Sequence, residues 1–225
     1  IQAMNIIKNA GYDGVEFYGT HYQTELYVAL LRQTGLVCAG WHTGIEALEN
    51  DFDATLRRNL AVGNKYICVP WYKSDKLDDW KRFADRLNAV AEKLSRCGVR
   101  TGYHSHAHDH QPVEGQIPWE IVAENTDPRV ILQLDTGNCM CGGADPYAVL
   151  TKYAGRNQSI HLKPYSKAAG YEPAIGEDDI PWEKVLSWSE NEGRTEWFVV
   201  EYEMDKAPVS AIEKSIRYLR TLRPR

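Results

Sequence analysis

Residues 78–106 have the sequence DDWKRFADRLNAVAEKLSRCGVRTGYHSH, and this stretch decides the fold. Its first part, 78–95, carries apolar side chains at helical spacing, and Gly98 stands where such a helix is expected to end. A short strand is predicted directly after Gly98, with His104 and His106 near its end. The stretch therefore predicts one helix followed by one strand.

The same order recurs on both sides of this stretch. Further helices are predicted over residues 1–10, 24–34, 49–62, 118–124, 146–153, 182–192 and 207–222. Further strands are predicted over residues 13–18, 36–41, 65–70, 129–134, 158–162 and 197–202. Short, nearly all-apolar strands that alternate with helices are typical of a parallel sheet covered on its faces. Because no break in composition separates the repeats, residues 1–225 are predicted to form a single α/β domain.

Two architectures accommodate this alternation, an open doubly wound sheet and a (β/α)8 barrel. The dinucleotide-binding version of the open sheet is disfavoured, because no Gly-rich phosphate loop follows the first strand. A complete barrel normally begins on a strand, whereas this chain begins on a helix that leads into one. The sequence therefore favours a (β/α)8 TIM barrel whose first strand is missing from this chain.

Composition narrows the classes of partner. The net charge is −5, whereas a nucleic-acid partner usually requires a basic face. No apolar run approaches the ~20 residues that span a bilayer. The five cysteines are an odd number without metal-knuckle spacing, which favours reduced thiols. We expect a cytoplasmic protein that acts without a nucleic acid or a membrane, and a homo-oligomer is compatible with the sequence.

Polar and aromatic residues stand where the predicted strands end. In a parallel α/β fold these carboxyl ends meet at one face, where the chemistry gathers. Loops are polar in any protein, and this explains one or two such residues. It does not explain charges that directly follow buried runs, which need a partner or a metal ion. A shared site is therefore predicted from Glu16, His42, Trp71, His104, His106, Asp135, His161, Lys163 and Glu201.

Four histidines occupy every second position from 104 to 110. In an extended segment His104 and His106 lie on the same face, and two neighbouring imidazoles suggest a metal site or proton transfer. The alternative is a His-rich surface loop. His108 and His110 are expected to be loop residues, because nothing else in the sequence converges on them.

The motifs together resemble the sugar phosphate isomerase/epimerase family of xylose isomerase-like TIM barrels, from Gly11 onward. The resemblance is carried by GYDGVE (11–16), GYHSH (102–106), LQLDTGN (132–138), HLK (161–163), GEDDIPW (176–182) and VVEYE (199–203). The Tyr-His-x-His form of the second motif marks a subgroup, and some relatives in it act on 3-keto-glycosides.

The resemblance implies one divalent metal ion, often manganese, held by four ligands from four strand ends. Asp135, His161 and Glu201 match the last three ligands. The first falls at His104, where many relatives have the Glu that is one of two acid/base carboxylates in the ketose epimerases. Whether His104 or His106 binds the metal stays open. Mixed nitrogen and oxygen ligation suits Mn²⁺, Co²⁺, Fe²⁺ or Zn²⁺.

The same ligand set predicts proton abstraction beside a sugar carbonyl. His106 and Glu201 are the acid/base candidates, and Lys163 is expected to support developing oxyanion charge. The alternatives for the three are a surface histidine, a purely structural ligand and a solvent-exposed lysine. Substrate contacts are predicted for Glu16, His42 and Trp71, with Trp41 as part of the wall, and residues 176–182 as a closing loop.

Three functions from different classes are compared. The first is a metal-dependent sugar isomerase or epimerase, with a lyase- or hydrolase-type elimination on a 3-keto-glycoside as its near variant. The second is an endonuclease-IV-like DNA repair enzyme, disfavoured because its zinc site needs a His three residues after Asp135, where this chain has Asn138. The third is a non-catalytic sugar-binding protein or partner subunit that binds a metal.

Overall fold

The alternation of helices and strands is confirmed in the computed structural model, which describes residues 1–19 and 23–223. The strands are β1 (Gly14–Tyr18), β2 (Val37–His42), β3 (Tyr66–Val69), β4 (Arg100–His104), β5 (Ile131–Gln133), β6 (Ser159–Leu162) and β7 (Trp197–Val200). The helices are α1 (Gln2–Ala10), α2 (Thr24–Thr34), α3 (Ile45–Asn50), α4 (Phe52–Ala61), α5 (Leu77–Ser95), α6 (Pro118–Asn125), α7 (Thr136–Cys141), α8 (Pro146–Lys152), α9 (Trp182–Asn191) and α10 (Pro208–Leu222).

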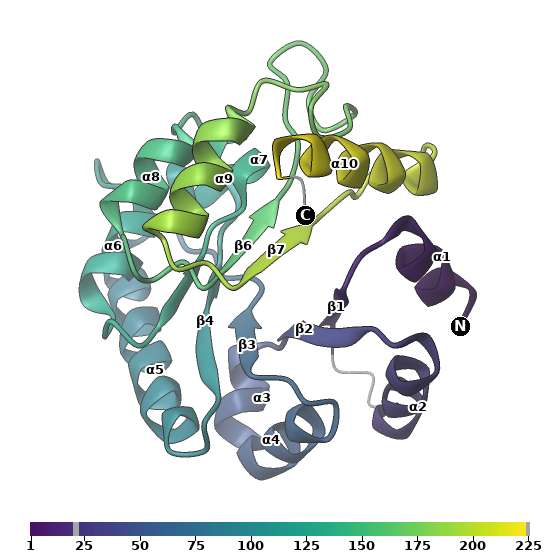
Figure 1. Cartoon of the computed structure of the whole chain (residues 1–225). Coiled ribbons are helices and arrows are strands. Elements are labelled where there is room, and N and C mark those ends of the chain that lie inside the picture. The colour runs from purple at the N-terminus through teal and green to yellow at the C-terminus, as the bar shows by residue number, and fades with distance from the viewer. Residues whose placement is uncertain (20–22, 224–225) are drawn as a thin grey trace.

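All strand pairs are parallel, as predicted. Strands β1 to β5 pair in sequence order, and β6 pairs with β7. A parallel bridge between Asp135 and His161 joins the two groups, and the N–H of His161 donates to the carbonyl of Leu134 at 2.8 Å. The helices lie outside the strands (Figure 1). The carboxyl ends of all strands therefore open toward the same end of the molecule.

The hydrogen-bonded wall that strands β1 to β7 form has a gap between β7 and β1. No pairing joins these two strands among the described residues, and a cavity of about 1060 Å³ lies against both. Outside the gap α1 packs on α10, with the Tyr12 hydroxyl donating to the carbonyl of Ile212 at 2.8 Å (Figure 1). The missing first strand stays a prediction, as does the single domain over 1–225.

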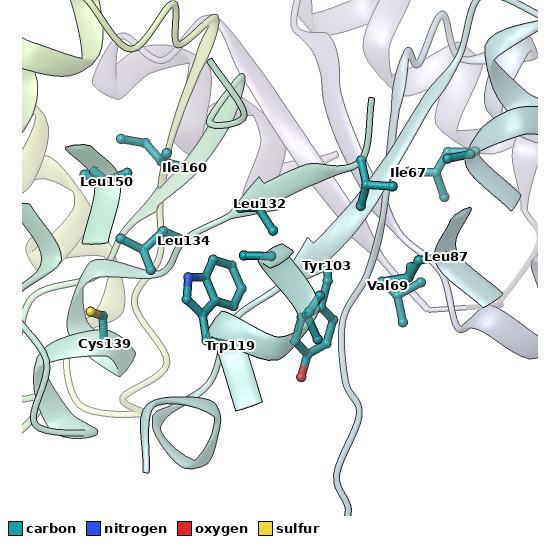
Figure 2. Packing of buried hydrophobic residues seen from close by; sticks show 14 of the residues in the cluster. Ile67, Val69, Leu87, Tyr103, Trp119, Leu132, Leu134, Cys139, Leu150 and Ile160 are labelled. Carbon is teal, nitrogen blue, oxygen red and sulfur yellow. The ribbon is translucent and has the colours of Figure 1, made fainter. Parts of the chain in front are cut away.

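The main core lies between the strands and the helices that cover them. Figure 2 shows Tyr103 and Trp119 among aliphatic side chains from β3, β5 and β6. Helix α5 presents Trp80, Phe83 and Leu87 to this core, all fully buried, because their spacing places them on one face of the helix. None of the helices described combines the length and apolar character that a bilayer crossing requires.

The structure departs from the local predictions in four places. Residues 49–62 do not form one helix, because the chain turns at Asp51 between α3 and α4. Helix α7 was not predicted, since it is only six residues long and contains Gly137. The strand before the histidines ends at His104, and a 3-10 helix, η1 (Ala107–His110), follows. His110 is buried in it, so the expectation of a loop residue fails there.

Candidate active site

Four predicted ligands converge at the carboxyl ends of β4 to β7. The donor atoms of His104, Asp135, His161 and Glu201 all lie within 4.8 Å of one another. The sets of possible metal ligands found among the described residues include His104 but not His106. A second set adds His42 to His104 and His161, so the ring of His42 lies at the same centre. The arrangement is the one that strand ends of a parallel barrel produce.

Two buried polar atoms of this centre have no hydrogen-bond partner among the described residues. They are Nδ1 of His104 and Oδ2 of Asp135, and Nε2 of His104 lies 3.9 Å from that same Oδ2. The other carboxylate oxygen of Asp135 accepts the N–H of Asn138 at 2.7 Å, which caps α7 and fixes the side chain. Because unpaired buried polar atoms are costly, this donor set fits a cation. Its two imidazoles and two carboxylates suit Mn²⁺, Co²⁺, Fe²⁺ or Zn²⁺.

The His161 ring is held from both sides. Its Nδ1 contacts Glu201, and its Nε2 lies 2.6 Å from Oε2 of Glu16. Glu16 also lies 3.1 Å from Nε2 of His42 and accepts a hydrogen bond from Gln133 at 3.0 Å. A carboxylate on the far nitrogen of a metal-binding His orients the ring, and this is what Glu16 is placed to do. Substrate contact by Glu16 and His42 stays a prediction, since both side chains are buried in this network.

Charge in the centre is balanced by protons and by Lys163. Burial alone would lower the pKa of His161, but Glu16 and Glu201 raise it to about 10. Burial would raise the pKa of Glu201, yet His161, followed by His104 and Lys163, holds it well below its usual range. For Asp135, burial and then the neighbouring Glu201 raise the pKa. A bound ion would replace the proton of His161 as the balancing charge.

Ion binding is expected to release at least one proton at neutral pH, because His161 must lose its proton to become a ligand and Asp135, whose pKa is also raised, must be ionised. Apparent affinity for Mn²⁺ should rise at least tenfold per pH unit between neutrality and the pKa of about 10 of His161. Calorimetric titration in buffers of different ionisation enthalpy measures the proton count. A His110→Gln variant, altered outside the centre, should keep that count, and buffer-independent heats would contradict the prediction.

Lys163 is only 3% exposed, so the alternative of a solvent-exposed lysine is wrong. Its Nζ donates to Oε1 of Glu201 at 2.9 Å and to Glu203, and it lies 5.0 Å from the ring centre of Tyr171. Burial would lower the pKa of Lys163, but Asp135 and Glu201 raise it. The side chain therefore stays a cation next to the four-residue centre, as oxyanion support requires.

His106 and Trp71 lie beside the centre at the rim of the large cavity. The ring of His106 is 5.0 Å from that of His104 and 4.5 Å from that of Trp71, edge to face. Burial, followed by the charge of His108, lowers the pKa of His106 to about 4, so the imidazole is neutral and able to accept a proton. Trp71 is 55% exposed, which leaves much of its side chain open to a ligand.

The connection after β6 contains residues 176–182, whose role as a closing loop stays a prediction. Within residues 176–182, Asp178 accepts the N–H of Gly176 at 3.0 Å and the indole N–H of Trp182 at 2.7 Å, so this segment is folded onto itself. Tyr171 of the same connection reaches the site, donating to Oδ1 of Asn138 at 3.0 Å. Sequence reasoning missed Tyr171 and Asn138 as site neighbours. A signal existed only for Asn138, as part of the motif after Asp135.

The fold and site together define a parallel α/β barrel with a candidate divalent-metal centre at the carboxyl ends of its strands. The model of the xylose isomerase-like TIM barrel family matches residues 4–222, and the chain belongs to that family. The predicted family and fold class are thereby confirmed. Membership of the Tyr-His-x-His subgroup stays a prediction.

The curated relatives share about a quarter of the aligned residues with this chain. Inosose dehydratase of Bacillus cereus (strain AH820) is 26% identical over 170 residues, covering 66% of this chain and 56% of the relative. That of Clostridium tetani (strain Massachusetts / E88) is 27% identical over 158 residues, covering 62% and 52%. The chain thus spans about half the length of the curated relatives it matches.

Solved structures share the fold. A sugar phosphate isomerase/epimerase of Parabacteroides distasonis ATCC 8503 superposes with a TM-score of 0.83 at 21% identity, over 99% of this chain and 88% of the other. An L-ribulose 3-epimerase superposes with a TM-score of 0.75 at 13% identity, over 98% and 87%. At these identities the likeness is one of architecture.

Proposed function

We propose that the protein is a divalent-metal-dependent enzyme that removes the proton next to a carbonyl of a sugar or cyclic keto-polyol. The observation that carries the proposal is the buried set of His104, Asp135, His161 and Glu201 with two unpartnered donor atoms. These four residues would hold the ion, with Mn²⁺ as the first choice. When bound, it supplies Lewis-acid polarisation of the substrate carbonyl.

The chain's own residues supply the proton chemistry. Neutral His106 accepts the α-proton, because its pKa of about 4 leaves the imidazole free at neutral pH. The ammonium of Lys163 is placed to hydrogen-bond the oxygen on which negative charge develops. Trp71 offers an apolar face to the carbon-bound hydrogens of the substrate ring. Glu201 stays ionised, so it serves as a ligand and as a second candidate base.

Dehydration is the outcome that we favour. The electron pair of the broken α carbon–hydrogen bond forms the new double bond as the bond from the β-carbon to its hydroxyl breaks. His106 then passes the proton that it took to the departing hydroxyl, which leaves as water. This route needs one proton carrier. Epimerisation needs a carrier on each face of the carbon, and His104 stands where the ketose epimerases keep one of theirs. The sequence likeness to inosose dehydratases supports the same choice.

Epimerisation is the second candidate, because the barrel superposes on an L-ribulose 3-epimerase and because Glu201 is a possible second carrier. Both reactions begin with the same proton removal. A non-catalytic metal-binding role remains the alternative from another class.

The proposal is tested by incubating the Mn²⁺-loaded protein in D₂O with keto-inositols, ketoses and 3-keto-glycosides. We expect deuterium at the carbon beside the carbonyl by NMR and, for dehydration, an absorbing enone. Epimer formation without an enone would select the second candidate. Neither exchange nor product across the panel, with the ion bound, would leave the binding role as the better account.

A further inference from the structure

A buried carboxylate lies directly beneath the predicted proton carrier. Asp109, in η1, is 0% exposed, and its Oδ2 accepts the backbone N–H of His106 at 2.7 Å and the hydroxyl of Tyr103 at 3.0 Å. An ionised carboxylate in such a position requires strong partners. Its bond to His106 fixes where the chain leaves β4, and with it where the imidazole of His106 begins.

The other oxygen of Asp109 faces His108. Nε2 of His108 lies 2.8 Å from the carbonyl oxygen of Tyr72, its hydrogen-bond partner. It also lies 2.9 Å from Oδ1 of Asp109, an ion-pair contact, and this oxygen has no hydrogen-bond partner among the described residues. Both neighbours are acceptors, so this nitrogen carries a hydrogen. The hydroxyl of Tyr103 also reaches the Tyr72 carbonyl, at 3.2 Å. Asp109 and His108 therefore connect the turn that carries His106 to the segment after β3 that carries Trp71.

Trp71 and His106, the two side chains at the edge of the cavity, are in contact next to His108. The ring of Trp71 lies 4.5 Å from that of His106 and 4.6 Å from that of His108. The backbone of η1 alone would hold them weakly, because a four-residue 3-10 helix has few and poorly aligned hydrogen bonds. The contacts of the buried Asp109 and the half-buried His108 supplement those of the turn.

We propose that His108 and Asp109 are a positioning pair, which holds the exposed face of Trp71 and the imidazole of His106 at a fixed separation for a ring-shaped substrate. The inference rests on the proposed function and deepens it. A cyclic keto-polyol laid flat on Trp71 turns one carbon-bound hydrogen toward His106, whereas an open-chain ketose has no flat face to lay there. The favoured substrate class is therefore the ring.

The test compares Asp109→Asn, His108→Leu and His108→Gln in the Mn²⁺-loaded protein. Asn at position 109 keeps the shape of Asp but can turn its amide N–H₂ toward the N–H of His108. Leu at position 108 removes that N–H. Gln restores an N–H at nearly the same place. Asp145→Asn is the matched control, since Asp145 also accepts backbone N–H groups at a helix start, in α8 and outside the centre.

We expect turnover of a cyclic keto-polyol to fall about 100-fold in Asp109→Asn and about tenfold in His108→Leu, as for small misplacements of a reacting group. His108→Gln and Asp145→Asn should stay within about threefold of the wild type. Wild-type turnover in Asp109→Asn, or a fall in His108→Gln equal to that in His108→Leu, would overturn the inference.

A second readout does not depend on activity. Amide hydrogen exchange over residues 105–110 should speed up about tenfold in Asp109→Asn and His108→Leu, but not in His108→Gln. An inactive wild type would refute the proposed function and leave this measurement to decide the pairing. Unchanged exchange in both damaged variants would refute the positioning pair even in an active enzyme.

Discussion

Replacing Asp135 by asparagine is expected to abolish tight Mn²⁺ binding and to lower turnover about 1000-fold, the equivalent of several kcal/mol of transition-state stabilisation. The carboxylate is fully buried, and its Oδ2 has no partner among the described residues other than the nearby cations of the centre. An amide of the same shape offers one neutral oxygen and a donor that would face His104 and Lys163. The loss should appear in binding and in turnover alike.

The same variant should remain folded. Asn is as good a helix N-cap as Asp, so the bond to the N–H of Asn138 can persist in α7. Calorimetric Mn²⁺ titration and thermal unfolding of the metal-free protein separate the two effects, with Asp145→Asn as the control for a lost cap charge. A variant that binds Mn²⁺ with wild-type affinity would remove Asp135 from the ligand set.

Gly102→Ala is expected to lower the free energy of unfolding by about 3 kcal/mol, at the upper end of what overpacking costs. A Cβ atom at this position would lie 2.2 Å from the carbonyl oxygen of Ile131 and 2.6 Å from its Cβ. Gly102 pairs with Ile131 in the register of β4 and β5, so the added methyl group pushes these two strands apart. Because β4 ends at His104 and β5 ends two residues before Asp135, the affinity for the ion should fall as well.

Urea unfolding of the metal-free protein measures the first effect, and Mn²⁺ titration the second. Gly44→Ala is the matched control, since its φ is −60° and the nearest atom to a new Cβ is Oε2 of Glu46 at 3.5 Å. Its cost should stay below about 1 kcal/mol. Equal destabilisation by both substitutions would show that the close approach of β4 to β5 is not what Gly102 serves.

Asp135 and Glu201 were predictable as strand-end residues because each follows a run of mainly apolar residues. The run before Asp135 and the run before Glu201 mark both the strands and their carboxyl ends, so their convergence follows from parallel topology alone. The glycines after α1 and α2 likewise marked helix ends, and both Gly11 and Gly35 adopt the left-handed conformation.

What the sequence could not supply depends on side chains meeting across the barrel. Glu16 lies within β1, two residues before the strand ends, and its bonds to His161 and Gln133 join residues more than a hundred positions apart. No local pattern encodes such a pairing. The prediction that nothing converges on His108 was wrong for the same reason, because its partner, the carbonyl of Tyr72, lies in the segment after another strand, β3. Alternation in sequence indicated neighbouring histidines, whereas the turn at η1 gives each one a different environment.

Side chains of the site also bridge the gap between β7 and β1. The ring of His161 contacts both sides of the gap, through Glu201 directly after β7 and Glu16 in β1. An open ring of strands is more compliant than a closed one, and its compliance is greatest where the hydrogen-bonded wall is interrupted. An ion bound by the proposed ligands would therefore also stabilise the contacts between the two sides of the gap by its binding free energy.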